Sequence, residues 1–267
     1  MPERYSYNLL GHFADGGIAS LEHIVLGDGR KALLRILQSS KVLNIRQQLL
    51  FRRGIKIRAA LSPHPRIVTS FEFGTKGLRP YEIIEFVEGR NLKALMNNRD
   101  AVLQDEMMTI LTQCAEAIAW IHTNGFMHLD IKPENFLVDT SGPKPVVKLT
   151  DFDLAQPATN NGPRKQSGTP AYMAPEQFKS KTAYMASDVF AFSVMAYQIV
   201  TGKQPFVSST KKGSLHKQAS ENYVPKAPID HIPSFPLKLN NAIMAGLEKR
   251  LDKRLPDMNA FLRKLLH

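Results

Sequence analysis

The sequence has a single cysteine, Cys114, among its 267 residues. One cysteine cannot form a disulfide within the chain, so a secreted scaffold stapled by disulfides is excluded. Cys114 lies in a run with helical periodicity, residues 107–121, which indicates a small buried hydrophobic side chain rather than a nucleophile or a metal ligand. A chain of this length can bury a core without disulfides or a structural metal.

Long hydrophobic runs are also missing. No stretch of about 18 apolar residues occurs, so no membrane-spanning helix is expected. Residues 1–5 lack the apolar run of a signal peptide. The expected location of the protein is therefore the cytoplasm.

Acidic residues are scarcer than basic ones, 24 against 35, and the formal net charge is +11. Such an excess attracts nucleic-acid phosphates. However, the basic residues are spread over separate segments, without interleaved aromatics or a recognisable nucleic-acid module. We therefore expect no nucleic-acid partner, but a solvated basic surface that favours acidic protein partners. The basic segments are residues 46–58, 164–165, 211–212 and 249–254.

In the first third of the chain, short apolar runs alternate with Gly-rich or polar turns, which predicts consecutive antiparallel strands. One helix is expected over residues 43–61, because its apolar residues recur at three- and four-residue spacings and Ser62-Pro63 follows. Together these elements predict a small first lobe over residues 1–87. The expected strands cover residues 8–13, 18–26, 31–37, 67–73 and 81–87.

Beyond residue 88 the pattern becomes helical, which predicts a larger second lobe over residues 88–267 and an α+β fold class overall. Residues 155–181 and 203–236 are rich in Pro, Ser and Gly and are expected to be irregular. Long loops in a compact domain are usually functional. The expected helices cover residues 92–97, 105–123, 185–201, 238–250 and 256–266.

The strongest chemical signal is the string His-Leu-Asp-Ile-Lys-Pro-Glu-Asn at residues 128–135, followed beyond a short hairpin by Asp-Phe-Asp at 151–153. Phosphoryl transfer needs a carboxylate that orients the attacking hydroxyl, a cation near the phosphate and oxygen ligands for Mg²⁺. Asp130 is the expected base and Lys132 the expected cation. Asn135 and Asp151 are the expected metal ligands. An isolated His-x-Asp would be weak evidence, but the whole string is strong.

These motifs resemble those of the eukaryotic-type (Hanks-type) Ser/Thr protein kinases, including the bacterial ones, and the resemblance runs nearly end to end. Residues 81–89 are similar to the last strand of the family's N-lobe and its hinge, and residues 168–176 are similar to its substrate-docking loop. The resemblance implies a bilobal fold and transfer of phosphate to Ser or Thr of a protein substrate. It implies ATP and Mg²⁺ as cofactors, with Mn²⁺ as an alternative to Mg²⁺.

The resemblance also implies which residues meet the nucleotide. Ile84 corresponds to the gatekeeper, and the hinge backbone is expected to contact adenine. The Gly-Gly turn is expected to let backbone N–H groups approach the phosphates. The full set of implied cofactor-binding residues is Gly16, Gly17, Leu33, Arg35, Ile84, Glu85, Val87 and Leu137.

Two roles outside the nucleotide site follow from the same resemblance. Glu176 is expected to pair with Arg254, and Asp188 corresponds to a buried acid that braces the catalytic loop. Leu129 departs from the family's arginine, which receives a phosphate of the activation loop. Activation is therefore expected not to depend on such a phosphate. Ser167 and Thr169 are either modification sites or structural hydroxyls.

The nucleotide site also departs from the family. Arg35 stands where a phosphate-binding lysine is expected, and the two cations are not interchangeable. Gly54 stands where the helix glutamate that pairs with that lysine is expected, so the ion pair is predicted to be absent and Arg35 to reach phosphate directly. Leu33 replaces a small alanine and is expected to narrow the pocket. Asp153 replaces a glycine, and its carboxylate is expected either to disfavour nucleotide or to recruit Mg²⁺.

The leading interpretation is an ATP-dependent Ser/Thr protein kinase, because none of Asp130, Lys132, Asn135 and Asp151 is lost. The alternative is a pseudokinase that acts as a binding, scaffolding or allosteric module. A third interpretation is a small-molecule phosphotransferase with a kinase-like fold. Residues 168–176 and Arg254 argue against it, because they belong to docking of a protein substrate in the family that the chain resembles.

Overall fold

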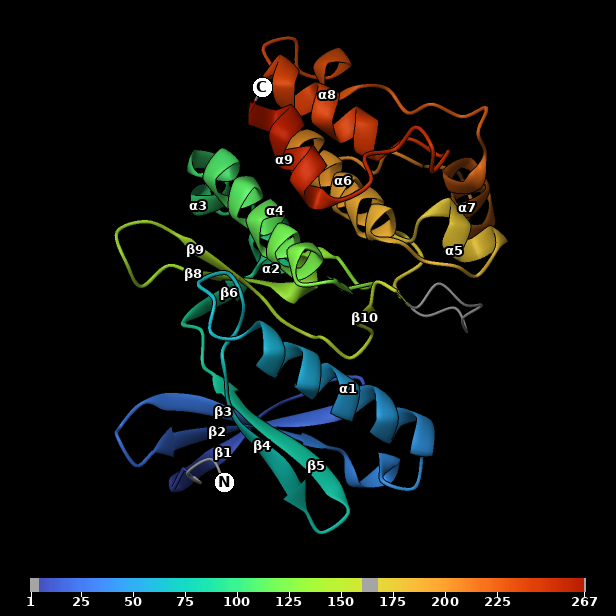
Figure 1. Cartoon of the computed structure of the whole chain (residues 1–267). Helices are drawn as coiled ribbons and strands as arrows, with labels where there is room; N and C mark the ends of the chain where they lie inside the picture. The colour runs from blue at the N-terminus through green and yellow to red at the C-terminus, as the bar shows by residue number, and fades with distance from the viewer. Residues whose placement is uncertain (1–4, 160–167, 267) are drawn as a thin grey trace.

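A five-stranded antiparallel sheet forms one end of the molecule in the computed structural model, which describes residues 5–159 and 168–266 (Figure 1). The spatial order of the strands is β1-β2-β3-β5-β4. The central strand β3 is buried along almost its whole length, which suits its run of Ala, Leu and Ile. The strands are β1 (Tyr7–Asp15), β2 (Ala19–Leu26), β3 (Lys31–Leu37), β4 (Ser70–Lys76) and β5 (Arg79–Glu85).

One long helix, α1 (Ile45–Leu61), packs beside this sheet (Figure 1). Asn44 caps the helix, because its side chain accepts a hydrogen bond from Gln47 N at 3.1 Å. Phe51 and Ile55 are its buried anchors against the sheet. The helix carries basic residues along much of its length and no acidic ones.

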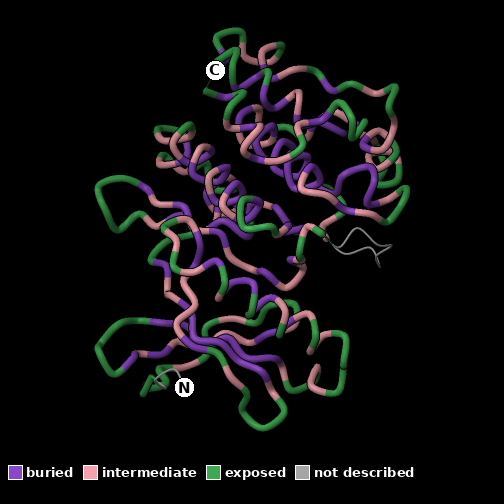
Figure 2. Tube along the Cα trace, viewed as in Figure 1, coloured by how far each residue is buried: buried purple, intermediate pink, exposed green. Residues whose placement is uncertain are grey.

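The rest of the described chain is mainly helical and contains the largest hydrophobic core. Two 17-residue helices, α4 (Met107–Thr123) and α6 (Met185–Thr201), supply much of that core. Figure 2 shows buried residues of this part of the chain in purple. The other helices surround them: α2 (Leu92–Asn97), α3 (Ala101–Asp105), α5 (Pro175–Lys179), α7 (Lys211–Ala219), α8 (Leu237–Gly246) and α9 (Met258–Leu266). Single 3₁₀ turns lie at η1 (Ser39–Lys41), η2 (Pro133–Asn135) and η3 (Pro228–Asp230).

Short strands at the boundary between the two parts place the chemical motifs. β6 (Gly89–Asn91), β8 (Phe136–Asp139) and β9 (Val146–Leu149) form a small sheet, and β7 (Phe126–Met127) pairs with β10 (Gln156–Pro157). The β8–β9 hairpin returns the chain so that the segment after β9 lies beside the 3₁₀ turn η2. Val68 N donates to Leu149 O at 3.0 Å, so the segment between α1 and β4 is bonded to the end of this hairpin.

The architecture confirms the predicted α+β class, with a five-stranded antiparallel sheet and one main helix followed by a mainly helical part. Two expectations of irregular structure are wrong, because α5 lies within residues 155–181 and α7 within 203–236. The helix α7 is mostly polar, so it lacks the apolar periodicity that predicts a helix. It is capped by Thr210, whose side chain accepts a hydrogen bond from Gly213 N at 3.0 Å. Cys114 is buried, as predicted, and burial raises the pKa of its thiol.

No helix among residues 5–159 and 168–266 is both long and apolar enough to cross a membrane.

Candidate active site

Asp188, in the first turn of α6, anchors the start of the candidate catalytic loop, residues 128–135. Its carboxylate accepts the backbone N–H of His128 at 2.7 Å and that of Leu129 at 2.8 Å. The side chain is 1% exposed, so these charge-assisted bonds form in a dry interior. Leu129 has a φ of 65°, a conformation rarely adopted by a leucine, and the two bonds to Asp188 oppose its relaxation. The bracing role expected for Asp188 is therefore present in the structure.

Asp130 is the centre of a short hydrogen-bond network. Lys132 Nζ donates to Asp130 Oδ2 at 2.6 Å, and Asn135 Nδ2 donates to Asp130 O at 2.8 Å. Thr169 Oγ1 donates to the other carboxylate oxygen at 3.3 Å. Asp130 thus has a fixed orientation and an ammonium group beside it.

Asp151 follows β9 and lies next to the catalytic loop. Thr150 N donates to Asn135 O at 2.9 Å, which aligns the two segments that carry the expected metal ligands. Asp151 has a φ of 61°, another left-handed conformation at the site. Burial raises the pKa of Asp151, but the positive charge of Arg35, with His128 and Lys132 beyond it, outweighs burial and lowers that pKa overall. The carboxylate is therefore ionised at neutral pH.

A cavity of about 370 Å³ lies between the first sheet and the catalytic loop. Its volume falls in the usual range for sites that bind a small molecule or cofactor. Most of the predicted cofactor-binding residues line it: Gly16, Gly17, Leu33, Arg35, Ile84, Glu85 and Leu137. Val87 does not line it, but packs in one cluster with Leu33 and Ile84. Asn135 and Asp151 also line the cavity, at the end that holds Arg35 and Asp153.

Both carboxylate oxygens of Glu85 have partners within the protein. Lys148 Nζ lies 2.8 Å from Glu85 Oε1, and Thr69 N donates to Glu85 Oε2 at 3.0 Å. The Glu85 carboxylate is therefore paired with a cation of β9 and bonded to the backbone before β4.

The predicted ion pair between residue 35 and a glutamate of α1 is absent, but Arg35, which lines the cavity, has carboxylate partners on other elements. Arg35 Nη1 donates to Glu82 Oε1 at 2.9 Å, and Arg35 Nη2 donates to Asp153 Oδ2 at 2.5 Å. No carboxylate comes from α1, because Gly54 stands at the expected position. Asp153 is therefore the partner of Arg35 rather than a free carboxylate in the metal site.

Glu82 and Arg58 were not singled out from the sequence, although a signal was present. Glu82 interrupts the apolar strand β5 and is fully buried, and Arg58 is the most deeply buried cation of α1, at 1% exposure. Charged residues are almost never fully buried unless they are paired. A charge inside an apolar run therefore predicts an opposite charge across the core, and here Arg58 Nη1 donates to Glu82 Oε1 at 2.7 Å.

The oxygen atoms at this end of the cavity suit a hard divalent cation. The side-chain N–H of Asn135 donates a hydrogen bond to Asp130 O. The side-chain oxygen of Asn135 is left as an acceptor, in the same cavity as the ionised Asp151. In the described part of the chain, no group of three or more His, Cys, Asp or Glu side chains is arranged to hold a metal. Mg²⁺ fits such a sparse set, because it takes one or two protein ligands together with water and substrate phosphates.

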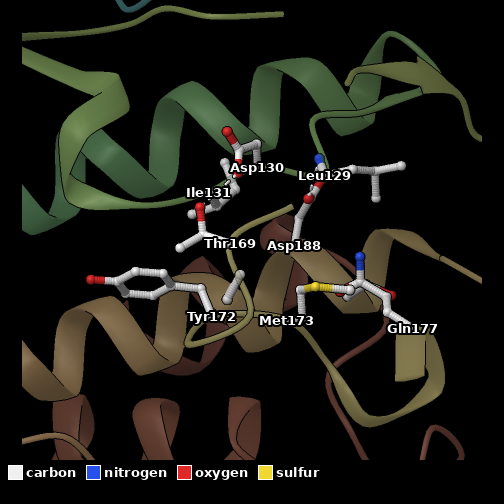
Figure 3. Close-up of a pocket in the computed structure, with 10 residues that line it drawn as sticks. Leu129, Asp130, Ile131, Thr169, Tyr172, Met173, Gln177 and Asp188 are labelled. Atoms are coloured by element: carbon white, nitrogen blue, oxygen red, sulfur yellow. Dashed lines mark hydrogen bonds between the residues drawn. The ribbon is translucent and has the colours of Figure 1, made fainter. Parts of the chain in front are cut away.

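Leu129 lies in an apolar environment. It is buried in a cluster with Met127 and Ala183, against which Leu154 and Met185 pack. All the described members of this cluster are apolar, and independence from an activation-loop phosphate stays a prediction. Of the two hydroxyls considered as modification sites, Thr169 is bonded to Asp130 and lies between the catalytic loop and Tyr172 (Figure 3), whereas Ser167 lies outside the described residues.

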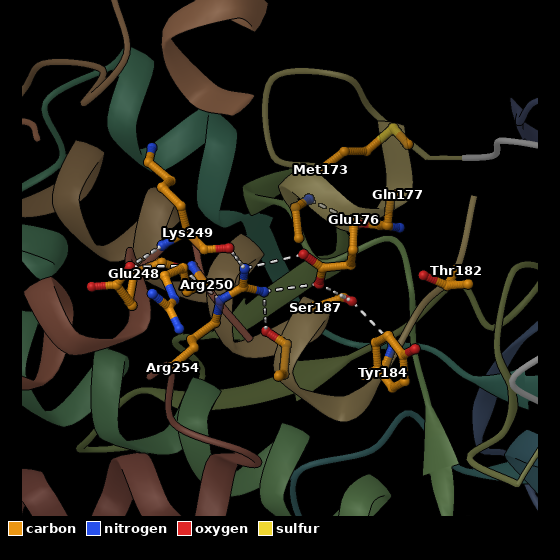
Figure 4. Close-up of polar contacts among 12 residues, drawn as sticks. Met173, Glu176, Gln177, Thr182, Tyr184, Ser187, Glu248, Lys249, Arg250 and Arg254 are labelled. Carbon is orange, nitrogen blue, oxygen red and sulfur yellow. Dashed lines mark hydrogen bonds and ion pairs between the residues drawn. The ribbon is translucent and has the colours of Figure 1, made fainter. Parts of the chain in front are cut away.

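The pair expected between Glu176 and Arg254 is present and bidentate (Figure 4). Arg254 Nη1 donates to Glu176 Oε1 at 2.8 Å, and Nη2 donates to Oε2 at 3.0 Å. Ser187 Oγ donates to the same carboxylate at 2.6 Å, so that the start of α6 is included. This buried network fixes the end of the 168–176 loop against α6.

Lys249, beside this network, is expected to make stability depend on pH. Burial, followed by the charge of Arg254, lowers the pKa of Lys249 to about 7 from an ordinary value near 10.5. Between these two pH values the unfolded chain binds more protons than the folded one, so the free energy of unfolding rises as the pH rises through this window. The slope has an upper limit of about 1.4 kcal/mol per pH unit.

The variant Lys249→Met keeps an unbranched side chain against Phe206, whose ring centroid lies 3.4 Å from Lys249 Nζ, and removes the charge. Urea unfolding of both proteins between pH 7 and 9.5 should show the wild type gaining stability relative to the variant as the pH rises. Parallel curves would show that Lys249 keeps its proton throughout this range.

Comparison with known proteins agrees with this geometry. Residues 10–267 match the model of the family described as "Protein kinase domain". The chain is 29% identical over 262 residues to the probable serine/threonine-protein kinase PknB of Lactococcus lactis, covering 96% of this chain and 41% of that protein. It is 30% identical over 269 residues to the serine/threonine-protein kinase Pkn1 of Myxococcus xanthus, covering 97% of this chain and 38% of that protein.

A third relative, the serine/threonine-protein kinase PknB of Mycobacterium leprae, is 25% identical over 233 residues, covering 84% of this chain and 36% of that protein. The chain therefore spans about two fifths of the length of the curated relatives that it matches.

Proposed function

Starting from the fact that this chain belongs to the protein kinase family, we propose that it transfers the γ-phosphate of ATP to Ser or Thr hydroxyls of protein substrates. One observation carries the proposal. Asp130 is bonded to Lys132 and Asn135, and Asn135 lines one cavity with the ionised Asp151. An oriented carboxylate, a cation and two oxygen ligands at one edge of a nucleotide-sized cavity are what phosphoryl transfer requires.

Each part of the chain has a distinct task in this proposal. Residues 1–87 hold the nucleotide, with the base between Leu33, Ile84 and Leu137 and with the Gly16-Gly17 turn over the phosphates. Val87 and the Glu85 backbone meet the edge of the base. Residues 88–267 supply the catalytic loop and the loop that docks the protein substrate.

The catalytic side chains act by orientation and charge. Asp130 accepts a hydrogen bond from the substrate hydroxyl and later its proton. Lys132, 2.6 Å from Asp130, places a positive charge at the transferred phosphate. Asn135 and Asp151 would hold Mg²⁺, with Mn²⁺ as an alternative. The bound metal supplies the neutralisation of charge that develops on the phosphate oxygens.

The substrate docks on the loop that ends at Glu176. This loop is held by Arg254 on one side, and by Gln218, whose Nε2 donates to Pro170 O at 3.1 Å, on the other. The net charge of +11 favours acidic protein substrates through long-range attraction. Because ATP is the proposed phosphate donor, the proposed site of action is the cytoplasm.

Removal of the divalent cation is expected to abolish phosphotransfer. The purified chain, given [γ-³²P]ATP and Mg²⁺ with a generic protein acceptor, should label itself or the acceptor on Ser or Thr. Excess EDTA should stop the labelling, and added Mg²⁺ should restore it. Labelling would be followed by gel autoradiography and acid hydrolysis to phosphoamino acids.

Each competing interpretation has its own outcome in this assay. A pseudokinase would give no label under any metal condition. A small-molecule phosphotransferase would consume ATP only when a small hydroxyl compound replaced the protein acceptor. Either result would overturn the proposed function.

A further inference from the structure

Four charged side chains form a buried cluster behind the cavity: Arg35, Arg58, Glu82 and Asp153. Glu82 Oε1 accepts from Arg58 Nη1 at 2.7 Å and from Arg35 Nη1 at 2.9 Å. Arg35 Nη2 reaches across to Asp153 Oδ2 at 2.5 Å. The side chains are between 0% and 15% exposed, and the two positive charges balance the two negative ones. The cluster joins β3, β5, α1 and the segment after β9, and Asp151 Oδ1 lies at its edge, 4.0 Å from Arg35 Nη2.

Gly54 makes room for this unit. A Cβ atom at Gly54 would lie 2.8 Å from Phe152 O and 3.0 Å from Asp153 Oδ1. The first distance is shorter than real Cβ contacts show, and the clashing atom belongs to the backbone. The helix position expected to carry the glutamate is therefore filled by the Asp-Phe-Asp segment itself, which lies directly against α1.

The same segment is held from the other side by a column of side chains. The rings of His128 and Phe152 meet edge to face with centroids 5.1 Å apart. The Arg58 guanidinium lies 5.3 Å from the Phe152 centroid, on the way to Glu82. This column of contacting side chains therefore connects the catalytic loop, through Phe152 and the cation of Arg58, to Glu82 in β5.

We propose that Asp153 is a positioning residue that takes over the task of the absent helix glutamate, from the segment that lies against Gly54. Its carboxylate fixes the Arg35 guanidinium at the cavity and, through that pair, fixes the neighbouring Asp151 relative to the sheet. Gly54 is the complementary change that admits Asp153. Arg35, Gly54 and Asp153 form one unit, so the three departures in the nucleotide site compensate one another. The kinetic part of the inference rests on the proposed function.

The geometry explains why both ends of the pair matter. Arg35 Nη2 lies 2.5 Å from Asp153 Oδ2 and 4.0 Å from Asp151 Oδ1. Asp153 is therefore the closer partner of the Arg35 guanidinium, and Asp151 stays charged without a direct hydrogen bond to Arg35. With Asp153 neutralised, Arg35 is free to close on Asp151 and compete with Mg²⁺ for it. The Arg35–Asp153 pair also joins β3 to the metal-binding segment, 118 positions away in the chain.

A double-mutant cycle on the chain without nucleotide or metal tests the pair. We would measure urea unfolding of the wild type, Arg35→Gln, Asp153→Asn and the double variant. The effects of the single substitutions are expected to be non-additive by at least about tenfold in the unfolding equilibrium constant. Arg35→Gln leaves the buried Asp153 carboxylate without its cation, and Asp153→Asn leaves Arg35 and Arg58 sharing the single carboxylate of Glu82. Additivity within about twofold would overturn the proposal.

The exposed pair Arg30–Asp28 is the matched control, with Nη2 2.7 Å from Oδ2 and side chains 49% and 46% exposed. The cycle of Arg30→Gln and Asp28→Asn is expected to be additive within about twofold, since exposed ion pairs contribute little.

The sign of a second substitution tests Gly54. In an ordinary helix, Gly→Ala is stabilising, because alanine has the higher helix propensity. Gly54→Ala is expected to be destabilising instead, lowering the midpoint of urea unfolding, because its Cβ meets Phe152 O. Lys56→Ala, at an exposed position of the same helix, is the control and should leave the midpoint nearly unchanged. A higher midpoint for Gly54→Ala would show that the Asp-Phe-Asp segment does not lie against α1.

Kinetics separate positioning from mere stability. For Asp153→Asn we expect the transfer rate at saturating ATP to fall at least about tenfold. The ATP dissociation constant is expected to rise less than threefold, because Arg35 still lines the cavity as a cation. Raised Mg²⁺ should recover part of the rate. Equal loss of rate and ATP affinity, with no response to Mg²⁺, would overturn the positioning role. If the wild type transfers no phosphate, the proposed function fails, but the cycle on the ligand-free chain still decides the pair.

Discussion

Replacing Asp130 with asparagine is expected to lower the rate of phosphotransfer by about 10²–10⁴-fold, the usual contribution of a positioned general base. The amide keeps the shape of the side chain and an oxygen that accepts from Lys132, which donates to Asp130 at 2.6 Å in the wild type. It cannot take the proton of the attacking hydroxyl. The rate would be measured at saturating Mg²⁺-ATP with a protein acceptor, together with the thermal unfolding midpoint.

The control for this substitution is Asp105→Asn, at an exposed position in α3, which should leave the rate unchanged. ATP affinity of Asp130→Asn should stay within a few-fold of the wild type, because Asp130 does not line the cavity. A variant that still folds and transfers phosphate at the wild-type rate would show that another group orients the hydroxyl. The assigned role of Asp130 would then be refuted.

The proximity of Asp130, Lys132 and Asn135 was predictable because it is local. All three lie within six positions of one another, and a 3₁₀ turn, Pro133–Asn135, brings them together. Asp151 is next to them because a hairpin, β8–β9, returns the chain, and hairpin signals are also local. These parts of the candidate site follow from short-range patterns.

The partners of Arg35 were not predictable in the same way. Glu82 and Asp153 lie 47 and 118 positions from it in the sequence. Which of several carboxylates meets a cation at that separation depends on how the sheet, helix and hairpin pack together. The departures at Gly54 and Asp153 were visible as separate anomalies, but their compensation appears only when α1 lies against the Asp-Phe-Asp segment.

Elements with a clear apolar pattern were also predictable, as β3 shows: its continuous apolar run matches the expected range of 31–37. The short helices α5 and α7 were missed because neither depends on an amphipathic pattern. α5 has only five residues, and it begins at Pro175. α7 consists mostly of polar residues and contains Gly213, so it has no apolar face that would predict a helix.

Replacing Arg254 with leucine is expected to lower the free energy of unfolding by about 3–5 kcal/mol, because it leaves the buried Glu176 carboxylate without its cation. The side chain of Arg254 is fully buried and that of Glu176 is 6% exposed, so water cannot replace the lost bonds. In a domain of this size the change corresponds to a fall of roughly 6–20 °C in the unfolding midpoint. Calorimetry and urea unfolding would measure it.

The exposed pair Arg250–Asp252 provides the control, with side chains 49% and 64% exposed. Arg250→Leu should change stability by less than about 1 kcal/mol, as is usual for surface ion pairs. The double variant Glu176→Leu with Arg254→Leu should recover part of the loss, because it removes both buried charges at once. If Arg254→Leu alone were as stable as Arg250→Leu, the bidentate pair would not be what anchors the 168–176 loop to α6. The bonds from Gln218 would then have to hold that loop instead.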